Sequence, residues 1–295
     1  MSEPNRREFV IAASAGAAFS AGLAARADSR PRSWPFYAFD NGLRDVKGID
    51  DKVKLLKDLG YDGIEYHLNP KEMPVMLDAL DKHGLKMFGI YTVSSLEDSI
   101  PANWSDWIKL LKGRDTRIEM NIRSKQHKPS DTRGNAKGVA LVKSVSDLCA
   151  DTGPVVSIYP HTGCWTERVE DGVRIAKLAG RRNVGTHFNL VHWQWVKQTR
   201  PLETTLTGAL SHLFCITING LKGPKGKRQK IRPLDDSDFD LASFLSLIKK
   251  IGYAGPVGLQ CWSVKEPAKD HLKRSIQTWR QLLKTLSTQN VRKQP

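Results

Sequence analysis

Eight short apolar segments, each followed by an amphipathic stretch, recur along the chain from Ser33 onward. Most are rich in β-branched and aromatic residues, as is typical of buried parallel strands. Regular strand–helix alternation predicts a parallel sheet with right-handed crossovers. Eight such units in a chain of 295 residues fit a closed (β/α)8 TIM barrel, which needs about 250 residues. The predicted strands cover residues 34–39, 63–67, 86–91, 117–122, 155–159, 184–188, 213–219 and 257–262.

The stretches between these segments carry signals for helix ends. Gly60, Gly84 and Gly252 follow three of them, and glycine readily adopts the left-handed conformation that ends many helices. Asp50 and Asp238 are placed to cap helices at 51–59 and 239–251. An open doubly wound sheet is the alternative fold, but no G-x-G-x-x-G follows the first strand.

The first 27 residues are typical of an export signal. Arg6 and Arg7 precede an apolar run at 10–25, and residues 25–27 fit an A-x-A cleavage site. We predict a twin-arginine-type signal peptide at 1–27 and an exported protein, periplasmic or extracellular. The apolar run is too short and too rich in Ala and Gly for a stable membrane span. The predicted organisation is therefore signal peptide 1–27, barrel 33–287 and a polar tail at 288–295.

Charge and cysteine content exclude few binding partners or kinds of cysteine site. The formal net charge is +15. Residues 1–27 hold three Lys/Arg and two Asp/Glu, so +14 belongs to the rest. Such basicity is compatible with an anionic partner but is also common in merely soluble proteins. The four cysteines lack C-x-x-C spacing, which argues against a zinc knuckle. We expect buried free thiols, with a disulfide between Cys215 and Cys261 left open.

Polar side chains stand at the ends of the four late strands. They are His161, Asn189 with His192, Asn219 and Gln260. The carboxyl ends of barrel strands are where enzymes of this architecture place their active sites. We therefore predict that these side chains share one site.

Four sequence phrases resemble the xylose isomerase-like TIM barrel family. They are "GYDGIEYHL", "PHTGCWTE", "VGTHFNLVHW" and "FDLASFLSLIKKIGYAGPVGLQ". The resemblance covers roughly residues 33–287 and implies the barrel fold. The family includes sugar phosphate isomerases and epimerases and the type-two AP endonucleases, so it implies chemistry on a carbohydrate or keto-sugar.

The resemblance also exposes a departure at the metal site. Family members typically hold one divalent metal with a Glu at strand five, Asp-x-x-His at strand six, a His at strand seven and a Glu at strand eight. In this chain those positions read Tyr159 or His161, Asn189 with His192, Asn219, and Gln260. Neutral donors bind Mn²⁺ or Mg²⁺ poorly. We expect at most weak binding of Mn²⁺, Mg²⁺ or Zn²⁺, through His161 and His192.

Isomerisation and epimerisation remove a proton next to a carbonyl, which needs a base and a stabiliser for the enediolate. Our catalytic candidates are Glu65, the one carboxylate in this set of strand ends, together with His161 and His192. Amides and aromatic walls suit sugar hydroxyls and ring faces, and a lysine opening a basic loop suits an anionic group. The substrate-binding candidates are Trp165, Asn189, Trp193, Asn219, Lys222 and Gln260.

Three functions remain open at this stage. The leading hypothesis is an exported sugar isomerase or epimerase that abstracts a proton next to a carbonyl, with a degenerate metal site. The alternatives are a 3-keto-glycoside lyase or hydrolase on the same fold, and a non-catalytic sugar-binding barrel. The expected partner is a small carbohydrate. A nuclease is disfavoured, because Asn189 and Gln260 replace the carboxylates that a metal cluster requires.

Overall fold

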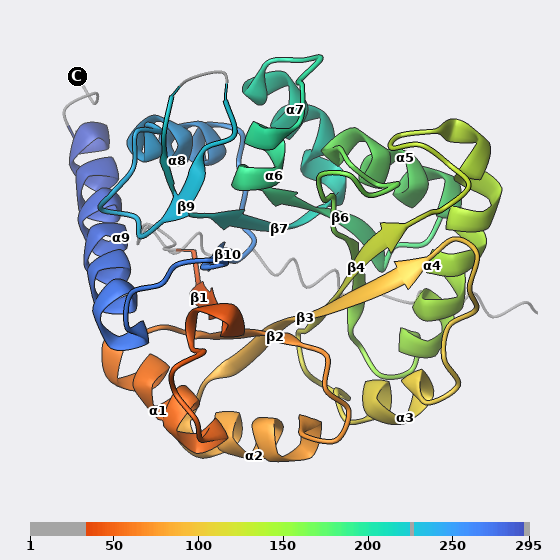
Figure 1. Cartoon of the computed structure of the whole chain (residues 1–295), viewed down its shortest axis with the longest axis horizontal. Coiled ribbons are helices and arrows are strands. Elements are labelled where there is room, and N and C mark those ends of the chain that lie inside the picture. The colour runs from red at the N-terminus through yellow and green to blue at the C-terminus, as the bar shows by residue number, and fades with distance from the viewer. Residues whose placement is uncertain (1–33, 225–226, 292–295) are drawn as a thin grey trace, which may run out of the picture. The chain divides into compact units, whose positions relative to one another are not determined.

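A closed barrel of eight parallel strands forms the centre of the protein in a computed structural model that describes residues 34–224 and 227–291 (Figure 1). The predicted signal peptide lies outside the described residues. The strand order around the barrel is β1-β10-β7-β6-β5-β4-β3-β2. The strands are β1 (Phe36–Phe39), β2 (Gly63–His67), β3 (Lys86–Ser95), β4 (Arg117–Arg123), β5 (Val155–Ile158), β6 (Val184–Asn189), β7 (Leu213–Ile218) and β10 (Val257–Leu259).

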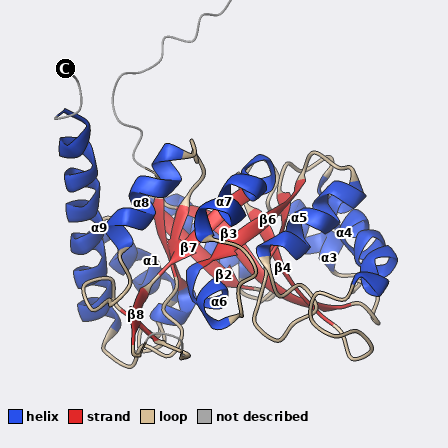
Figure 2. Cartoon of the chain, turned by 90° about the horizontal axis from the view of Figure 1, so that it is seen from above, coloured by secondary structure: helices blue, strands red, loops and turns tan. Residues whose placement is uncertain are grey.

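Helices surround the strands, as Figures 1 and 2 show. They are α1 (Ile49–Leu59), α2 (Met73–His83), α3 (Trp104–Lys109), α4 (Asn135–Cys149), α5 (Val169–Ala179), α6 (Leu190–Trp195), α7 (Leu202–Ala209), α8 (Leu241–Lys250) and α9 (Ala268–Val291). A small antiparallel hairpin of β8 (Gly220–Lys222) and β9 (Lys230–Arg232) follows β7. Among the described residues, no helix is both long and apolar enough to cross a membrane.

The predicted (β/α)8 fold is confirmed, and the strand bounds differ mainly at two places. β3 continues to Ser95 because its pairing with β4 runs on to Ser95 and Arg123. β10 ends at Leu259, where its pairing with β1 and β7 stops. Gln260 is therefore the first residue beyond the last barrel strand.

The helix ends confirm the glycine signals and correct both aspartate caps. Gly60 and Gly84 cap their helices with φ of 86° and 66°. α1 begins at Ile49, so Asp50 lies inside its first turn. α8 is capped by Asp240, whose carboxylate accepts from the Ser243 amide at 2.9 Å. Asp238 was the wrong cap because its carboxylate accepts from the Gly223 amide in the loop between β8 and β9.

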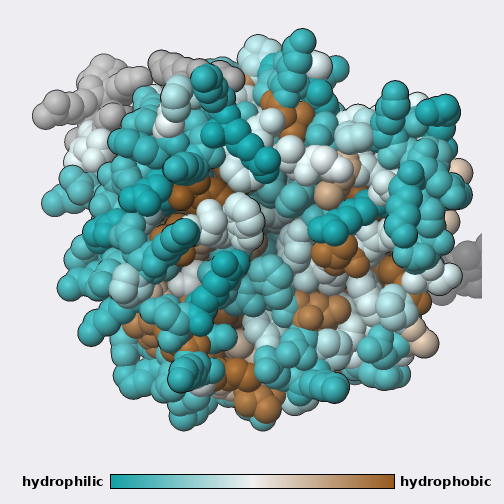
Figure 3. All heavy atoms as spheres, viewed as in Figure 1, coloured by the Kyte–Doolittle hydropathy of each residue, from teal (hydrophilic) through white to brown (hydrophobic). Residues whose placement is uncertain are grey.

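The core has two parts, one outside and one inside the ring of strands. Outside, α9 packs over β1, and the Trp279 ring stacks on Phe36 with centroids 4.2 Å apart. Inside, a smaller cluster fills the barrel with Tyr37, Phe39, Phe88, Tyr159 and Cys215. The four cysteines are buried and free, as expected. The face shown in Figure 3 is mainly hydrophilic with small apolar patches, so the apolar side chains are largely inside.

Candidate functional site

Tyr159 is the centre of the polar cluster at the carboxyl ends of the strands. Its phenol oxygen accepts hydrogen bonds from the Asn189 side-chain amide at 2.5 Å and from the Gln260 amide at 3.4 Å. Burial, helped by nearby Glu65, raises the pKa of Tyr159 well above its usual value, so the phenol stays protonated. Two members of the predicted strand-end cluster, Asn189 and Gln260, therefore meet at this hydroxyl group.

The amides are held in place by further hydrogen bonds. Asn189 caps α6, since its side-chain oxygen accepts from the backbone amides of Val191 and His192 at 3.1 and 3.2 Å. The Gln260 oxygen accepts from the Asn41 amide at 2.7 Å and from the Trp262 backbone at 2.9 Å. Their oxygen atoms thus point at N–H donors within the protein.

Two histidines lie side by side next to Tyr159. His161 follows β5 and His192 lies on α6, and their ring centroids are 3.9 Å apart. His161 Nδ1 lies 2.9 Å from the Thr162 carbonyl. Because a carbonyl only accepts, this contact places the proton of neutral His161 on Nδ1 and leaves Nε2 as the acceptor. Burial is the main cause that lowers the pKa of both histidines, and that of His192 falls well below its usual value.

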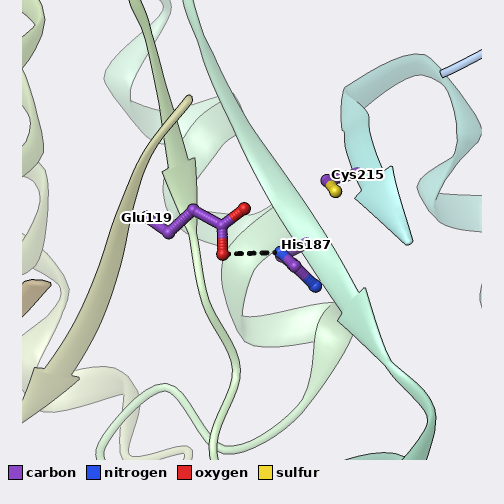
Figure 4. A group of neighbouring side chains, drawn as sticks. All are labelled: Glu119, His187 and Cys215. Atoms are coloured by element: carbon purple, nitrogen blue, oxygen red, sulfur yellow. Dashed lines mark ion pairs between the residues drawn. The ribbon is translucent and has the colours of Figure 1, made fainter. Parts of the chain in front are cut away.

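A second polar cluster lies inside the barrel. Glu119 on β4 and His187 on β6 form an ion pair of 3.0 Å between Oε2 and Nδ1, and Cys215 on β7 lies beside them (Figure 4). All three side chains are fully buried. Glu65 belongs to this inner cluster, because the Tyr37 hydroxyl donates to it at 3.3 Å. Burial, and then the charge of Glu119, raise the pKa of Glu65 well above its usual value.

Comparison with protein families decides the evolutionary placement. Residues 53–282 match the model of the family described as xylose isomerase-like TIM barrel. The chain belongs to the xylose isomerase-like TIM barrel family. No curated protein matches the chain.

Several solved structures have a similar fold, and their names describe different activities. One is an IolI protein with a bound zinc atom, 16% identical, covering 85% of this chain and 99% of its own, with a TM-score of 0.69. A D-allulose 3-epimerase from Methylomonas sp. is also 16% identical, with coverage of 85% and 99% and a TM-score of 0.66. A probable 3-DHS dehydratase from Bacillus anthracis is 13% identical, covering 83% and 98%, with a TM-score of 0.64. At these identities the likeness shows the fold alone.

The xylose isomerase-like barrel of this chain does not offer the family's usual metal ligands at its mouth. Tyr159, Asn189, Asn219 and Gln260 occupy those strand ends and carry no charge. The Asn189 and Gln260 oxygens are already engaged, and their nitrogens face Tyr159. A divalent cation prefers anionic oxygen ligands with free lone pairs. The residues at the mouth therefore do not fit such a metal.

The predicted site residues separate into three places. The mouth brings together His161, Asn189, His192 and Gln260. Asn219 is also buried at its strand end, where its amide donates to the Gly220 carbonyl at 2.7 Å. Glu65 lies in the inner cluster and is only 1% exposed.

The predicted aromatic and basic contacts lie elsewhere. Trp165 is buried in the core, and its indole donates to the Asp131 carbonyl at 2.8 Å. Trp193 is half-buried and packs beside Phe188. The Lys222 ammonium lies at the surface, paired with Asp236 and Asp238 at 3.2 and 3.0 Å.

Sequence reasoning missed Glu119 and underrated Tyr159. The signal for Glu119 was present, because polar residues alternate with apolar ones along β4, whose sequence is RIEMNIR. A charged residue on the inward face of a short barrel strand must find a partner inside. Its partner, His187, is 68 positions later in the numbering, which only the closed barrel brings near.

A cavity of about 390 Å³ opens beside the mouth. Tyr91 lines it and also makes an edge-to-face contact with Tyr159, with ring centroids 5.1 Å apart. The remaining lining mixes polar residues, among them Ser94, Asp98 and Ser99, with apolar ones such as Ile100 and Trp104. A cavity of this size is within the range that accommodates small ligands.

Proposed function

We propose that the protein is a carbohydrate-processing enzyme that removes a proton next to the carbonyl of a sugar or keto-sugar, without a divalent metal at the mouth. His161 is assigned as the base through Nε2, and His192 as the second acid/base group. This assignment favours the histidines over Glu65, whose carboxyl group is enclosed inside the barrel.

One observation carries the proposal: two imidazoles with lowered pKa lie 3.9 Å apart at the strand ends, where relatives would place charged ligands. A neutral imidazole is able to accept a proton at neutral pH, and general base catalysis is most effective when the pKa of the base lies near the working pH. The Thr162 carbonyl orients His161 so that its free nitrogen is defined.

The surroundings favour a polar substrate without charge. Asn219 has a buried side-chain oxygen with no hydrogen-bond partner among the described residues. The cavity beside the mouth has a mixed lining of polar and apolar residues, which suits a sugar with hydroxyl groups and C–H faces. Sugar hydroxyls both donate and accept, which matches amides and hydroxyls. The Tyr159 phenol, kept protonated by burial, is placed near both histidines and supplies a neutral donor for an enolate oxygen.

A product screen in D₂O tests the proposal. The protein is incubated with keto-sugars and with 3-keto-glycosides, and ¹H NMR follows the proton next to the carbonyl. Isomerisation or epimerisation gives exchange and a new sugar, whereas a lyase gives an unsaturated product and a released aglycone. Ligand-induced thermal stabilisation without exchange or product would contradict the enzymatic proposal and favour a binding barrel.

The matched control for the screen is another histidine. His161→Gln should abolish exchange, and His212→Gln should leave it unchanged, because His212 precedes β7 at the opposite end of that strand. Equal loss in both variants would show that the effect is not specific to the mouth.

Export is proposed on the sequence alone. The paired arginines and the A-x-A site support processing after residue 27. N-terminal sequencing of the protein from the periplasm or medium tests it, with Arg6→Lys/Arg7→Lys as the variant. An unprocessed N-terminus on cytoplasmic protein would overturn it.

A further inference from the structure

The inner cluster brings three different metal-binding side chains to one point of the barrel interior. Glu119, His187 and Cys215 come from β4, β6 and β7, and their ligand atoms all lie within 4.8 Å of one another (Figure 4). Strand register pairs His187 directly with Cys215. The strand between β4 and β6 presents the small Ser157 beside Glu119. The convergence is thus built by the barrel strands, which are rigid elements.

Several polar atoms of this cluster lack hydrogen bonds. Within residues 34–224 and 227–291, no hydrogen-bond partner is present for either Glu119 carboxylate oxygen, for Glu65 Oε1 or for His187 Nδ1. The 3.0 Å contact between Glu119 and His187 is close but lacks hydrogen-bond geometry. A buried polar atom without a partner costs about 1–3 kcal/mol, and more for a charged group. Glu65 and Glu119 lie within hydrogen-bonding reach of each other and can share one proton, which leaves His187 Nδ1 and the other Glu119 oxygen without a partner. A cation between these two atoms would supply one.

The donor set selects a particular class of metal. A thiol sulfur, an imidazole nitrogen and a carboxylate oxygen are ligands of Zn²⁺, whereas Mg²⁺ and Ca²⁺ require oxygen. Burial raises the pKa of the Cys215 thiol, so zinc binding would release its proton. The resulting thiolate and Glu119 would then carry two negative charges, which one Zn²⁺ neutralises. The ligand set therefore fits Zn²⁺ far better than Mg²⁺ or Ca²⁺, which prefer sites made of oxygen ligands.

The groups around the cluster match the outer shell of a zinc site. His187 Nε2 lies 2.9 Å from the Thr217 hydroxyl, which leaves Nδ1 facing Glu119. Histidines that bind metal usually donate their other ring N–H to an oxygen in this way. The Tyr37 hydroxyl lies 2.7 Å from Cys215 Sγ and 3.3 Å from the Glu65 carboxylate, so its one proton is shared between these two acceptors.

We propose that Glu119, His187 and Cys215 form a zinc site enclosed in the barrel, separate from the strand-end positions where the family resemblance places a metal. The site is closed to solvent, since all three ligands are fully buried. Zinc there would stabilise the fold by joining β4, β6 and β7. This inference does not depend on the proposed function at the mouth.

Metal analysis of the full chain tests the site. Protein expressed with zinc in the medium should purify with about one zinc per chain. Replacing zinc by Co²⁺ should produce a thiolate-to-cobalt charge-transfer band. Cys215→Ser should abolish that band, whereas Cys261→Ser should retain it, because Cys261 is also buried and free but lies outside the cluster.

A measurement on the unaltered protein avoids any dependence on how variants fold. X-ray absorption at the zinc edge should show one sulfur neighbour together with nitrogen or oxygen neighbours. A protein that holds no zinc after expression with the metal, or a zinc with no sulfur neighbour, would overturn the proposal. In that case Glu119 and His187 form an ion pair alone.

Discussion

The imidazole rings of His161 and His192 lie 3.9 Å apart, one on the loop after β5 and the other on the helix after β6. Trp195 packs edge-on against His192, and the Arg228 guanidinium lies 3.9 Å from the centroid of the Trp195 ring. Burial is the main cause that lowers the pKa of His192, and repulsion from His161, His187 and, least, Arg228 adds to it. The mouth is thus arranged to keep its histidines neutral.

We predict that His192 makes the protein less stable at mildly acidic pH. Its pKa is lowered in the folded state, so below about pH 6.5 the unfolded chain binds a proton that the folded chain excludes. The free energy of unfolding should then fall as pH drops, by up to about 1.4 kcal/mol per pH unit from this group. Urea unfolding between pH 5 and 7 measures the slope, which should be shallower in His192→Gln. An unchanged slope would contradict the assignment.

We predict that Tyr159→Phe destabilises the protein by about 1–3 kcal/mol. The substitution removes the acceptor for the buried Asn189 amide and the Gln260 amide while keeping the ring. Chemical denaturation measures the change. Removing both the acceptor and the amide, in Tyr159→Phe/Asn189→Leu, should not add the two single costs. Strict additivity would show that the two groups do not interact.

We predict that the packing of Trp165 stabilises the fold. A substitution at a neighbouring glycine tests this prediction and leaves the tryptophan itself unchanged. A Cβ atom added at Gly138 on α4 would lie 2.4 Å from the Trp165 ring, so Gly138→Ala should cost about 1–3 kcal/mol. Gly208 on α7 has nothing within 4 Å of its added Cβ, so Gly208→Ala should stabilise by about 0.4–1 kcal/mol. Thermal unfolding compares the two, and equal effects would contradict the packing of Trp165.

The sequence predicted the architecture because its signals are local and repeated. The eight apolar segments predict the strands, and the amphipathic stretches between them predict the helices. The glycines at Gly60 and Gly84 predict where two of the helices end. The strand-end residues were also found, since a parallel barrel gathers those ends by geometry. How deep a side chain lies inside the barrel was harder to predict. The sequence of β2 does not show that Glu65 faces Tyr37 and Glu119 instead of solvent.

Two residues that were predicted to bind substrate, Trp165 and Lys222, lie away from the mouth for another reason. Trp165 and Lys222 follow strands, as site residues do, but side-chain packing and charge partners decided their places. Trp165 packs against Gly134, just before α4, and against Gly138 on α4. Lys222 pairs with aspartates that come later in the chain. Such partners are set by tertiary contacts, which a strand pattern does not specify.

We predict that restoring carboxylates at the mouth restores metal binding there. Asn189→Asp should keep the cap of α6, since its Oδ1 already accepts from the helix amides. Together with Gln260→Glu it supplies two anionic oxygen ligands. Calorimetric titration with Mn²⁺ should show new binding in the double variant relative to the parent. Equal binding in the two proteins would contradict our view that neutral residues exclude the metal.

The most direct test of the central claim is the exchange rate of the proton next to a keto-sugar carbonyl in D₂O, with and without added Mn²⁺ or Mg²⁺. The mouth needs no such metal if the neutral His161–His192 pair moves the proton. We therefore predict the same rate under both conditions, and its loss in His161→Gln but not in His212→Gln. Exchange that appears only after a divalent metal is added, or that survives in His161→Gln, would contradict this account.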